Sequence, residues 1–361
     1  MNDAGHNPDH AFKGRKNRKF PPWLSAFLLL VSLGILVYGF FFYDRGFDYD
    51  SLPEGWVIIR PPHDVHAMVV QGDSIWTGGK EGVFCIDRIN HEYLDELVTD
   101  PPLEYVRVLH VDKQGKLWIG HANGLTCYDG ENFCLYNEAT GLPDNRVNAI
   151  ISDTNGGVLI GTWKGVGRMC DGEFKMMERE EGLLDNMVNV LMNSSDGSTW
   201  FGSYTAPRGG ITVMKKGQVQ YFDKDNGLPH NNVTSIIEDL QGSVWVGTGL
   251  YKRGGAVRFS RIGDAWKIDS VLTCNDGLAG EKVRSVFPDR EQRMWFGSEY
   301  DGLTVCDGKS MITLSGDQGL SHPEVKCILQ DSEDNIWLGT HDGITFLSSA
   351  VADSLVRTYQ K

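Results

Sequence analysis

The sequence lacks the short motifs that mark many enzymes and cofactor-binding proteins. It contains no nucleophile elbow, no P-loop and no dinucleotide-binding fingerprint. Its seven cysteines form no C-x-x-C pair, so a zinc or dithiol redox site of that kind is excluded. His63 and His66 fit a loop and the start of a strand better than a metal site. We therefore expect no catalytic residue, no metal and no cofactor.

Basic residues are also in short supply. The chain has 34 Lys and Arg against 48 Asp and Glu, a formal net charge of −14. Residues 1–43 hold 5 basic and 2 acidic residues, which leaves 29 basic and 46 acidic residues for the remainder, a difference of −17. Nonspecific binding to nucleic acid depends on neutralising phosphates, so an acidic domain of this kind is not expected to bind it.

One stretch, residues 20–43, has no charge at all and is almost wholly apolar. A helix of about 20 residues reaches about 30 Å, the thickness of a bilayer core. Five Lys and Arg precede it within residues 1–19, and the acidic segment 44–54 follows. The positive-inside rule then predicts a single-pass membrane protein with a cytoplasmic tail, an anchor at 20–43 and a periplasmic or extracellular domain at 55–361. A cleaved signal peptide is the alternative, although no small-x-small cleavage site follows the apolar run.

A repeat of 41 to 50 residues runs through the rest of the chain. Its anchor is a large hydrophobic residue followed two positions later by Gly, and it occurs at Trp76, Trp118, Leu159, Trp200, Trp245, Trp295 and Trp337. An Asp stands six residues before the anchor in five copies, and a Val stands twelve residues before it in six.

Each copy is expected to form four short strands, as in "VNAIIS" and "VLIG" of the third copy and "GLTCY" and "FCLYN" of the second. Seven such units packed around an axis make an all-β, seven-bladed β-propeller. Either residues 55–60 or residues 354–360 are expected to supply the strand that closes the ring.

The segments "GLPDNRVNAIISDTNGGVLIGT" and "VTSIIEDLQGSVWVGT" resemble the two-component regulator propeller repeat. In that family the repeats form extracytoplasmic sensor parts of membrane-anchored signalling proteins, often joined to a kinase. This sequence has one propeller and no kinase, so the resemblance implies a sensing or binding module whose signal is carried by a protein partner.

The recurring Asp and Trp residues are expected to be scaffold, because a feature repeated around a ring answers a structural demand, whereas catalysis needs unlike groups at one place. Function is therefore sought where the copies differ. One variable position follows the repeated Val, and it holds His66, Arg107, Asn148, Asn189, Thr234, Arg284 and Lys326. These residues are expected to surround the mouth of the central channel. Their cations favour an anionic group such as that of a carboxylated or sulfated sugar; plain solvation of the channel is the alternative.

The loop between the second and third strands is the other variable position. It offers aromatic, cationic and imidazole side chains at Trp163, Tyr204, Arg208, Tyr251, Lys252, Arg253, Tyr300, His121, His341 and Asp342. Exposed aromatics on one rim can stack on sugar rings or anchor a partner protein. The alternative is that each ring packs on its neighbouring blade.

Cys127 and Cys134 could face each other across the hairpin "CYDGENFC". A disulfide between them would suit an exported domain, although isolated structural cysteines are the simpler interpretation.

These observations predict non-catalytic recognition of a carbohydrate or anionic small ligand, or of a signalling or envelope protein. A glycan-cleaving or lyase-type propeller enzyme is the second hypothesis.

Overall fold

The computed structural model describes residues 52–153, 156–170, 173–177, 182–204 and 208–358. The expected tail, the anchor at 20–43 and most of the linker lie outside the described residues. Among the residues that are described, no helix is long and apolar enough to span a membrane.

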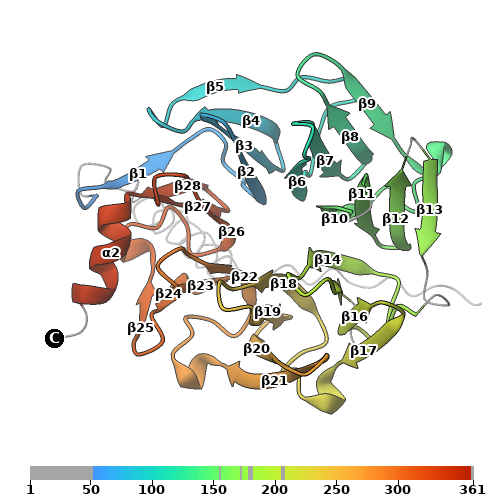
Figure 1. The fold of residues 1–361 in the computed structure, drawn as a ribbon. Helices are drawn as coiled ribbons and strands as arrows, with labels where there is room; N and C mark the ends of the chain where they lie inside the picture. The colour runs from blue at the N-terminus through green and yellow to red at the C-terminus, as the bar shows by residue number, and fades with distance from the viewer. Residues whose placement is uncertain (1–51, 154–155, 171–172, 178–181, 205–207, 359–361) are drawn as a thin grey trace, which may run out of the picture. The chain divides into compact units, whose positions relative to one another are not determined.

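The described residues form seven four-stranded antiparallel sheets arranged in a ring, which confirms the predicted seven-bladed propeller (Figure 1). Blade 1 contains β2 Ala67–Gln71, β3 Ser74–Gly79, β4 Gly82–Asp87 and β5 Tyr93–Glu96, and blade 2 contains β6 Val108–Val111, β7 Leu117–His121, β8 Gly124–Tyr128 and β9 Phe133–Tyr136. Blade 3 contains β10 Val147–Ser152, β11 Val158–Thr162, β12 Gly165–Cys170 and β13 Glu173–Met177, and blade 4 contains β14 Val188–Asn193, β15 Thr199–Ser203, β16 Ile211–Lys215 and β17 Gln218–Phe222. Blades 5 and 6 contain β18 Val233–Glu238, β19 Val244–Gly249, β20 Gly254–Ile262 and β21 Ala265–Leu272; and β22 Val283–Pro288, β23 Met294–Ser298, β24 Leu303–Cys306 and β25 Met311–Leu314.

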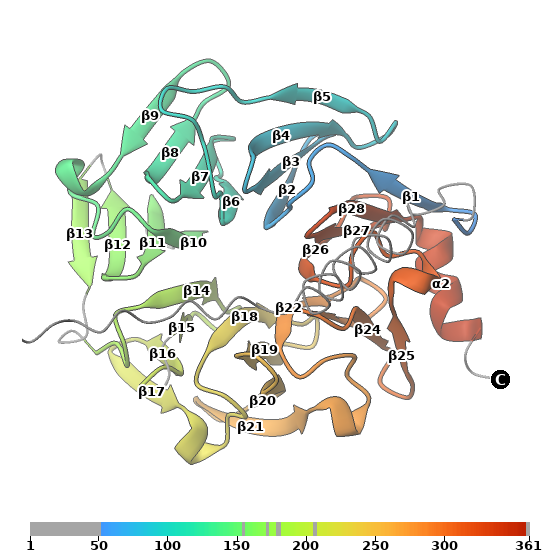
Figure 2. The same cartoon turned by 180° about the vertical axis from the view of Figure 1, so that it is seen from behind.

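Blade 7 is assembled from both ends of the domain. Its three inner strands are β26 Val325–Gln330, β27 Ile336–Thr340 and β28 Gly343–Leu347, and its outer strand is β1 Trp56–Ile59 (Figure 2). Trp56 pairs with Leu347 and Ile59 with Ile344. Of the two segments expected to close the ring, residues 55–60 therefore do so. Within the other segment, residues 354–358 are helical and belong to α2 Ser349–Thr358.

The repeated Asp and Trp form a hydrogen-bonded pair within each blade that carries both. Trp118 Nε1 donates to Asp112 Oδ2 at 2.8 Å, and Asp112 Oδ1 accepts the backbone N–H groups of Gln114 and Lys116. Trp245, Trp295 and Trp337 donate in the same way to the Asp six residues earlier. One carboxylate thus closes the turn and satisfies a buried indole, which explains the six-residue spacing as scaffold.

The repeated Gly and Val form the contact between blades. A Cβ atom added at Gly120 would lie 2.6 Å from Val147 of the next blade, and one added at Gly339 would lie 2.7 Å from Val65 of blade 1. Both distances are shorter than a normal carbon contact, so the position two residues after the Trp anchor favours Gly. The same Val packs on the same Gly around the ring and joins blade 7 to blade 1.

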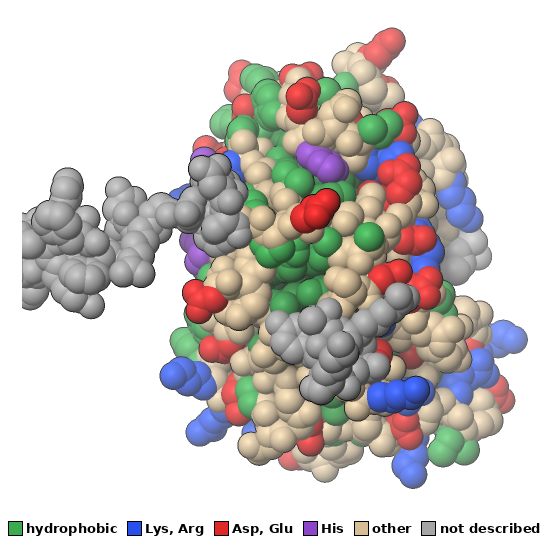
Figure 3. Space-filling model, turned by 90° about the vertical axis from the view of Figure 1, so that its left-hand side faces the viewer, with side chains coloured by type: hydrophobic (Ala, Val, Ile, Leu, Met, Phe, Trp, Pro, Cys, Tyr) green, Lys and Arg blue, Asp and Glu red, His purple; other side chains and the backbone are tan. Residues whose placement is uncertain are grey.

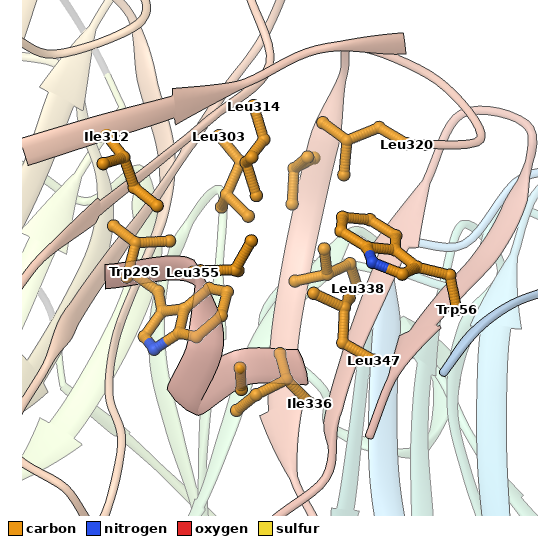
Figure 4. Close-up of a cluster of buried hydrophobic side chains, with 13 residues drawn as sticks. Trp56, Trp295, Leu303, Ile312, Leu314, Leu320, Ile336, Leu338, Leu347 and Leu355 are labelled. Carbon is orange, nitrogen blue, oxygen red and sulfur yellow. The ribbon is translucent and has the colours of Figure 1, made fainter. Parts of the chain in front are cut away.

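Buried hydrophobic side chains fill the spaces between neighbouring blades. Between blades 6 and 7, Trp295 and Leu303 meet Leu338, and Trp56 from β1 and Leu355 from α2 complete the cluster (Figure 4). On the side where β1 and α2 lie in Figure 1, hydrophobic side chains gather at the middle of the surface and charged ones surround them (Figure 3).

Candidate functional site

A β-bulge shapes the start of the innermost strand in five blades. In blade 3 the pairing shifts between Val147 and Ala149, so Asn148 is left out of the ladder. The same shift in blades 4 to 7 leaves out the residue after the repeated Val, namely Asn189, Thr234, Arg284 and Lys326. A bulged residue turns its side chain away from the sheet. In blades 1 and 2 the equivalent residues, His66 and Arg107, directly precede the first strand.

These seven residues line one cavity of about 470 Å³, called here the pore-mouth pocket. The structure therefore brings together the whole variable ring that follows the repeated Val. Three aromatic side chains complete the lining: Tyr105, Trp163 and Tyr204. None of the described residues that line the pocket is an Asp or Glu, although the domain as a whole is strongly acidic.

The neutral members of the ring join neighbouring blades. Asn148 Nδ2 donates to the carbonyl of Val188 at 3.1 Å, and Asn189 Nδ2 donates to that of Val233 at 2.8 Å. Thr234 continues the series by donating to the carbonyl of the next repeated Val. These three side chains have a structural role that the sequence did not reveal, and their donors are engaged between the blades.

The cations from blades 6 and 7 belong to an ion-pair network at the point where the ring closes. Lys326 forms an ion pair with Asp64, and its Nζ lies 3.2 Å from His66 Nε2. Arg284 pairs with Glu324 at 3.5 Å, and Glu324 also lies 3.8 Å from Lys326. Burial by itself would raise the pKa of Asp64, but hydrogen bonds from His66 and Lys326 lower it well below its usual range.

Arg107 differs from the other two cations because no described carboxylate lies within ion-pair distance of it. Its Nη1 donates to Asn148 Oδ1 at 2.7 Å, and its guanidinium lies 5.9 Å from the centre of the Trp163 ring. The surrounding protein displaces water and lowers the pKa of Arg107; Tyr204 opposes this, and the nearby Arg146 and Arg284 reinforce it. The side chain is exposed and lines the cavity. Its guanidinium keeps the positive charge, since the ordinary pKa of arginine lies far above neutral pH.

Trp163 is held in place by Arg146, whose guanidinium lies 4.2 Å from the ring centre. Arg146 is itself fixed by two hydrogen bonds to Asp144, both of 2.7 Å. These bonds lower the pKa of Asp144 to about 2. The aromatic wall of the pocket is therefore supported by a fixed ion pair behind it.

Tyr105 was not predicted from the sequence. Its backbone has φ of +53°, in the left-handed region that non-Gly residues avoid, and its side chain is 51% exposed. Bonds from its N–H to the carbonyl of Lys80 and from Val106 N–H to that of Gly79 fix this conformation.

A signal for Tyr105 was nevertheless present in the sequence. It occupies the position before the repeated Val, which also holds Asp64, Arg146, Lys282 and Glu324 in other blades. This second variable position supplies Asp64 and Glu324, the two carboxylates that pair with Lys326 and Arg284 of the ring.

Only part of the predicted rim reaches the pocket. Trp163 and Tyr204 line it, whereas Tyr251 and Tyr300 are 74% and 53% exposed and stand outside the lining. Arg208, Lys252 and Arg253 are also exposed and lie outside it.

His121 corrects the prediction of an accessible rim histidine. It is only 1% exposed and lies 3.0 Å from Thr126 Oγ1 on the neighbouring strand, and burial lowers its pKa to about 4. It ends the strand β7 inside the blade, where a ligand on the rim does not reach it.

His341 and Asp342 take part in closing the ring. His341 Nδ1 lies 3.2 Å from Lys326 Nζ. Asp342 accepts a 2.6 Å hydrogen bond from Arg60 and lies 3.2 Å from His63 Nδ1. His341 Nδ1 also lies 3.6 Å from Asp64 Oδ1, so both residues link blade 7 to the segment between β1 and blade 1. Neither residue lines the pocket.

Cys127 and Cys134 face each other in the pairing of β8 with β9, and both are free thiols. Within the described ranges, no group of three or more His, Cys, Asp or Glu side chains is placed to bind a metal ion.

Solved structures with the same fold include extracellular domains of proposed hybrid two component systems and a lyase. The extracellular domain of a proposed hybrid two component system from B. thetaiotaomicron, BT3049, is 21% identical with a TM-score of 0.65, over 80% of this chain and 40% of that one. The extracellular domain of BT4673 from the same organism is 18% identical with a TM-score of 0.53, over 80% and 45%. This chain therefore spans less than half of either domain. A catalytically inactive virginiamycin B lyase from Staphylococcus aureus, solved with quinupristin, is 15% identical with a TM-score of 0.65, over 81% and 98%.

At these identities the similarities to solved structures show the fold alone. The comparison with curated proteins found no match for the chain. A family model described as "Two component regulator propeller" matches residues 141–164, 227–249 and 319–342. These segments cover the entry and the first two strands of blades 3, 5 and 7. The matched segments of these three blades are therefore repeats of the two component regulator propeller kind, and they lie within the seven-bladed ring.

Proposed function

We propose that this propeller is a non-catalytic recognition module that binds an anionic, sugar-sized ligand in the pore-mouth pocket. One observation carries the proposal: Arg107 is exposed to the cavity, is not ion-paired with any described carboxylate, and stands in a lining without acidic side chains. An Arg guanidinium offers a planar set of donors that matches a carboxylate or an ester anion.

The aromatic side chains near Arg107 favour a ring-shaped ligand. Trp163 lies beside its guanidinium, and Tyr105 and Tyr204 line the same cavity. Aromatic faces pack against the apolar faces of sugar rings, while the polar tips of Tyr side chains can bond hydroxyl groups. A volume of about 470 Å³ is in the range of sites that take small molecules.

A non-catalytic role is supported by the state of the acidic groups. Asp64 and Glu324, the carboxylates beside the pocket, are both engaged with cations. A general acid or base needs a proton that it can exchange with the substrate, and a carboxylate held in ion pairs is a poor one. We expect no turnover of a bound glycan.

The setting of the module belongs to the same proposal. The apolar, uncharged residues 20–43 form a single membrane anchor, the basic N-terminus lies in the cytoplasm, and the propeller faces the periplasm or exterior. A protein partner in the membrane or envelope carries the signal onward. The similar solved sensor structures, which are extracellular domains, support this arrangement.

The first test removes the free cation. Arg107→Ala should weaken binding of acidic oligosaccharides by at least about tenfold, because a hydrogen bond to a charged group contributes about 1.5–3 kcal/mol. Isothermal titration of paired acidic and neutral oligosaccharides measures the effect. Arg253→Ala is the matched control, since it deletes the same side chain from the exposed rim outside the lining. Equal affinity of the Arg107→Ala variant and the wild type would refute the proposal.

The second test concerns Tyr105. Glycine adopts the left-handed backbone of this position without strain, so Tyr105→Gly should leave the protein as stable as before or raise its stability by up to about 1 kcal/mol. The same change should weaken binding, because it removes one aromatic wall of the pocket. Chemical denaturation and titration of the same samples measure the two effects separately.

Gln292→Gly provides the control for Tyr105. Gln292 has φ of +66° in a turn where four other blades have Gly115, Gly156, Gly197 or Gly242. Its replacement should stabilise the protein and leave binding unchanged. If Tyr105→Gly instead lowers stability with no loss of binding, the tyrosine serves packing and not the ligand.

A further inference from the structure

The pore-mouth pocket holds three permanent cations, and two of them are already neutralised. Arg284 pairs with Glu324, and Lys326 pairs with Asp64. Both carboxylates are well enclosed, with side-chain exposures of 16% and 12%. Glu324 also lies 3.8 Å from Lys326, so the four groups form one network of two positive and two negative charges.

The cations just outside the lining are neutralised in the same way. Arg146 is bound to Asp144, and Lys282 forms an ion pair with Glu299. Of the Lys and Arg residues that line the pocket, Arg107 is thus the one that forms no ion pair with a described carboxylate. The pocket therefore presents one uncompensated positive charge to a ligand.

The position of this charge also matters. Arg107 lies beside Trp163 and in the electrostatic range of Tyr204, whereas Asp64 and Glu324 pair with Lys326 and Arg284 where blades 6, 7 and 1 meet. An anion seated at Arg107 meets one free guanidinium and aromatic faces. A second negative charge on the same ligand would lose water without gaining a free cation, and it would stand closer to the two carboxylates.

We propose that the pore-mouth pocket selects ligands with a single negative charge attached to a ring, such as a uronic acid residue, over neutral and doubly charged ligands of the same shape. This inference rests on the proposed function and specifies the ligand class of the same site. The selection comes from the charge count, since Glu324 and Asp64 cancel two of the three lining cations.

Three sugars that differ only at one carbon test the charge count. Glucose, glucuronate and glucose 6-phosphate share a ring and carry zero, one and nearly two negative charges at about pH 8, where histidines are largely neutral. Titration of the full chain should show glucuronate binding at least about fivefold more tightly than either of the others. Equal or tighter binding of glucose 6-phosphate would overturn the selectivity, while the proposed anion site would stand. If neither anion binds more tightly than glucose, the proposed function itself fails.

A variant that changes the charge count gives an independent test. Glu324→Gln keeps the shape of the side chain but frees Arg284, so the pocket gains a second uncompensated cation. The ratio of affinities for glucose 6-phosphate and glucuronate should then shift toward the phosphate by about fivefold or more. Glu138→Gln is the matched control, because Glu138 pairs with Lys164, which does not line the pocket. An unchanged ratio in Glu324→Gln, or the same shift in the control, would overturn the inference.

Discussion

Replacing Asp289 by alanine should lower the free energy of unfolding by about 3–5 kcal/mol. Asp289 is fully buried, and its Oδ2 accepts hydrogen bonds from Arg293 Nε at 2.5 Å and Trp295 Nε1 at 2.8 Å. Its Oδ1 accepts the backbone N–H of Arg293 at 2.8 Å. Alanine would leave the buried indole of Trp295 without this acceptor, and the buried guanidinium of Arg293 would keep only the half-exposed Asp353, at 2.9 Å, as a described carboxylate partner. Urea denaturation followed by circular dichroism measures the loss.

Asp239→Ala separates the charge effect from the turn. Asp239 makes the same bonds to the turn and to Trp245, but the residue at the Arg293 position is Ser243. The control should therefore cost about 1–3 kcal/mol, the price of unmet hydrogen bonds alone.

A double variant, Asp289→Ala with Arg293→Met, should recover part of the loss, because it removes the buried cation that has lost its buried carboxylate partner. If the double variant is as unstable as the sum of the two single variants, the loss of the Asp289–Arg293 ion pair is not the cause.

The fold was predictable because the same demand recurs in every blade. Four Trp anchors donate to the Asp six residues earlier, and in every blade the Gly two residues after the anchor must admit the Val of the next blade. Strand limits followed from this periodicity: "VNAIIS" is β10 Val147–Ser152, and "GLTCY" is β8 Gly124–Tyr128. A pattern enforced seven times can be recognised even where single residues deviate, as Leu159 does.

The candidate site was predictable only in outline. Each repeat has one residue directly after the repeated Val, at the start of its innermost strand. In a ring of seven blades these seven residues were therefore expected to lie close together near the axis. The partner of each side chain could not be derived in this way, because ion pairs depend on rotamers that meet across blades. Lys326 and Asp64 are 262 residues apart in the chain, and the repeat places them on neighbouring blades without showing that their side chains pair. Tyr105 was missed for a different reason, since it lies outside the position that was compared.

The strand that closes the ring was left open between two segments, and local residues explain the outcome. β1 brings Trp56, which is 8% exposed and packs on Leu347 and Leu320 at the outer edge of blade 7. The C-terminal segment forms α2 instead, and its Leu355 reaches the same cluster from outside. The two ends of the domain thus share one hydrophobic cluster (Figure 4).

Trp56→Ala should destabilise the protein by about 3–5 kcal/mol, the usual cost of truncating a buried aromatic side chain. The Trp56 ring also lies against Gly319, because a Cβ added at Gly319 would be 3.0 Å from the ring. Gly319 has no side chain that could move into the cavity left by alanine. The loss should appear first as local opening. In its sheet β1 pairs only with β28. Detachment of β1 from β28 should therefore open blade 7 before the other blades unfold. Hydrogen–deuterium exchange of the peptide that covers β28 measures this opening.

Trp266→Ala is the matched control for the closing strand. Trp266 is 4% exposed and lies in the outer strand β21, but it belongs to blade 5, whose four strands are continuous in the chain. Its removal should cost a similar free energy, because a similar apolar surface is lost, without faster exchange in β28. Faster exchange in β28 with Trp56→Ala, but not with Trp266→Ala, would show that the pairing of β1 with β28 holds the ring closed. Equal exchange in the two variants would mean that closure depends on the Gly339 and Val65 contact and on the ion pairs of Lys326, and that β1 only covers the outer edge.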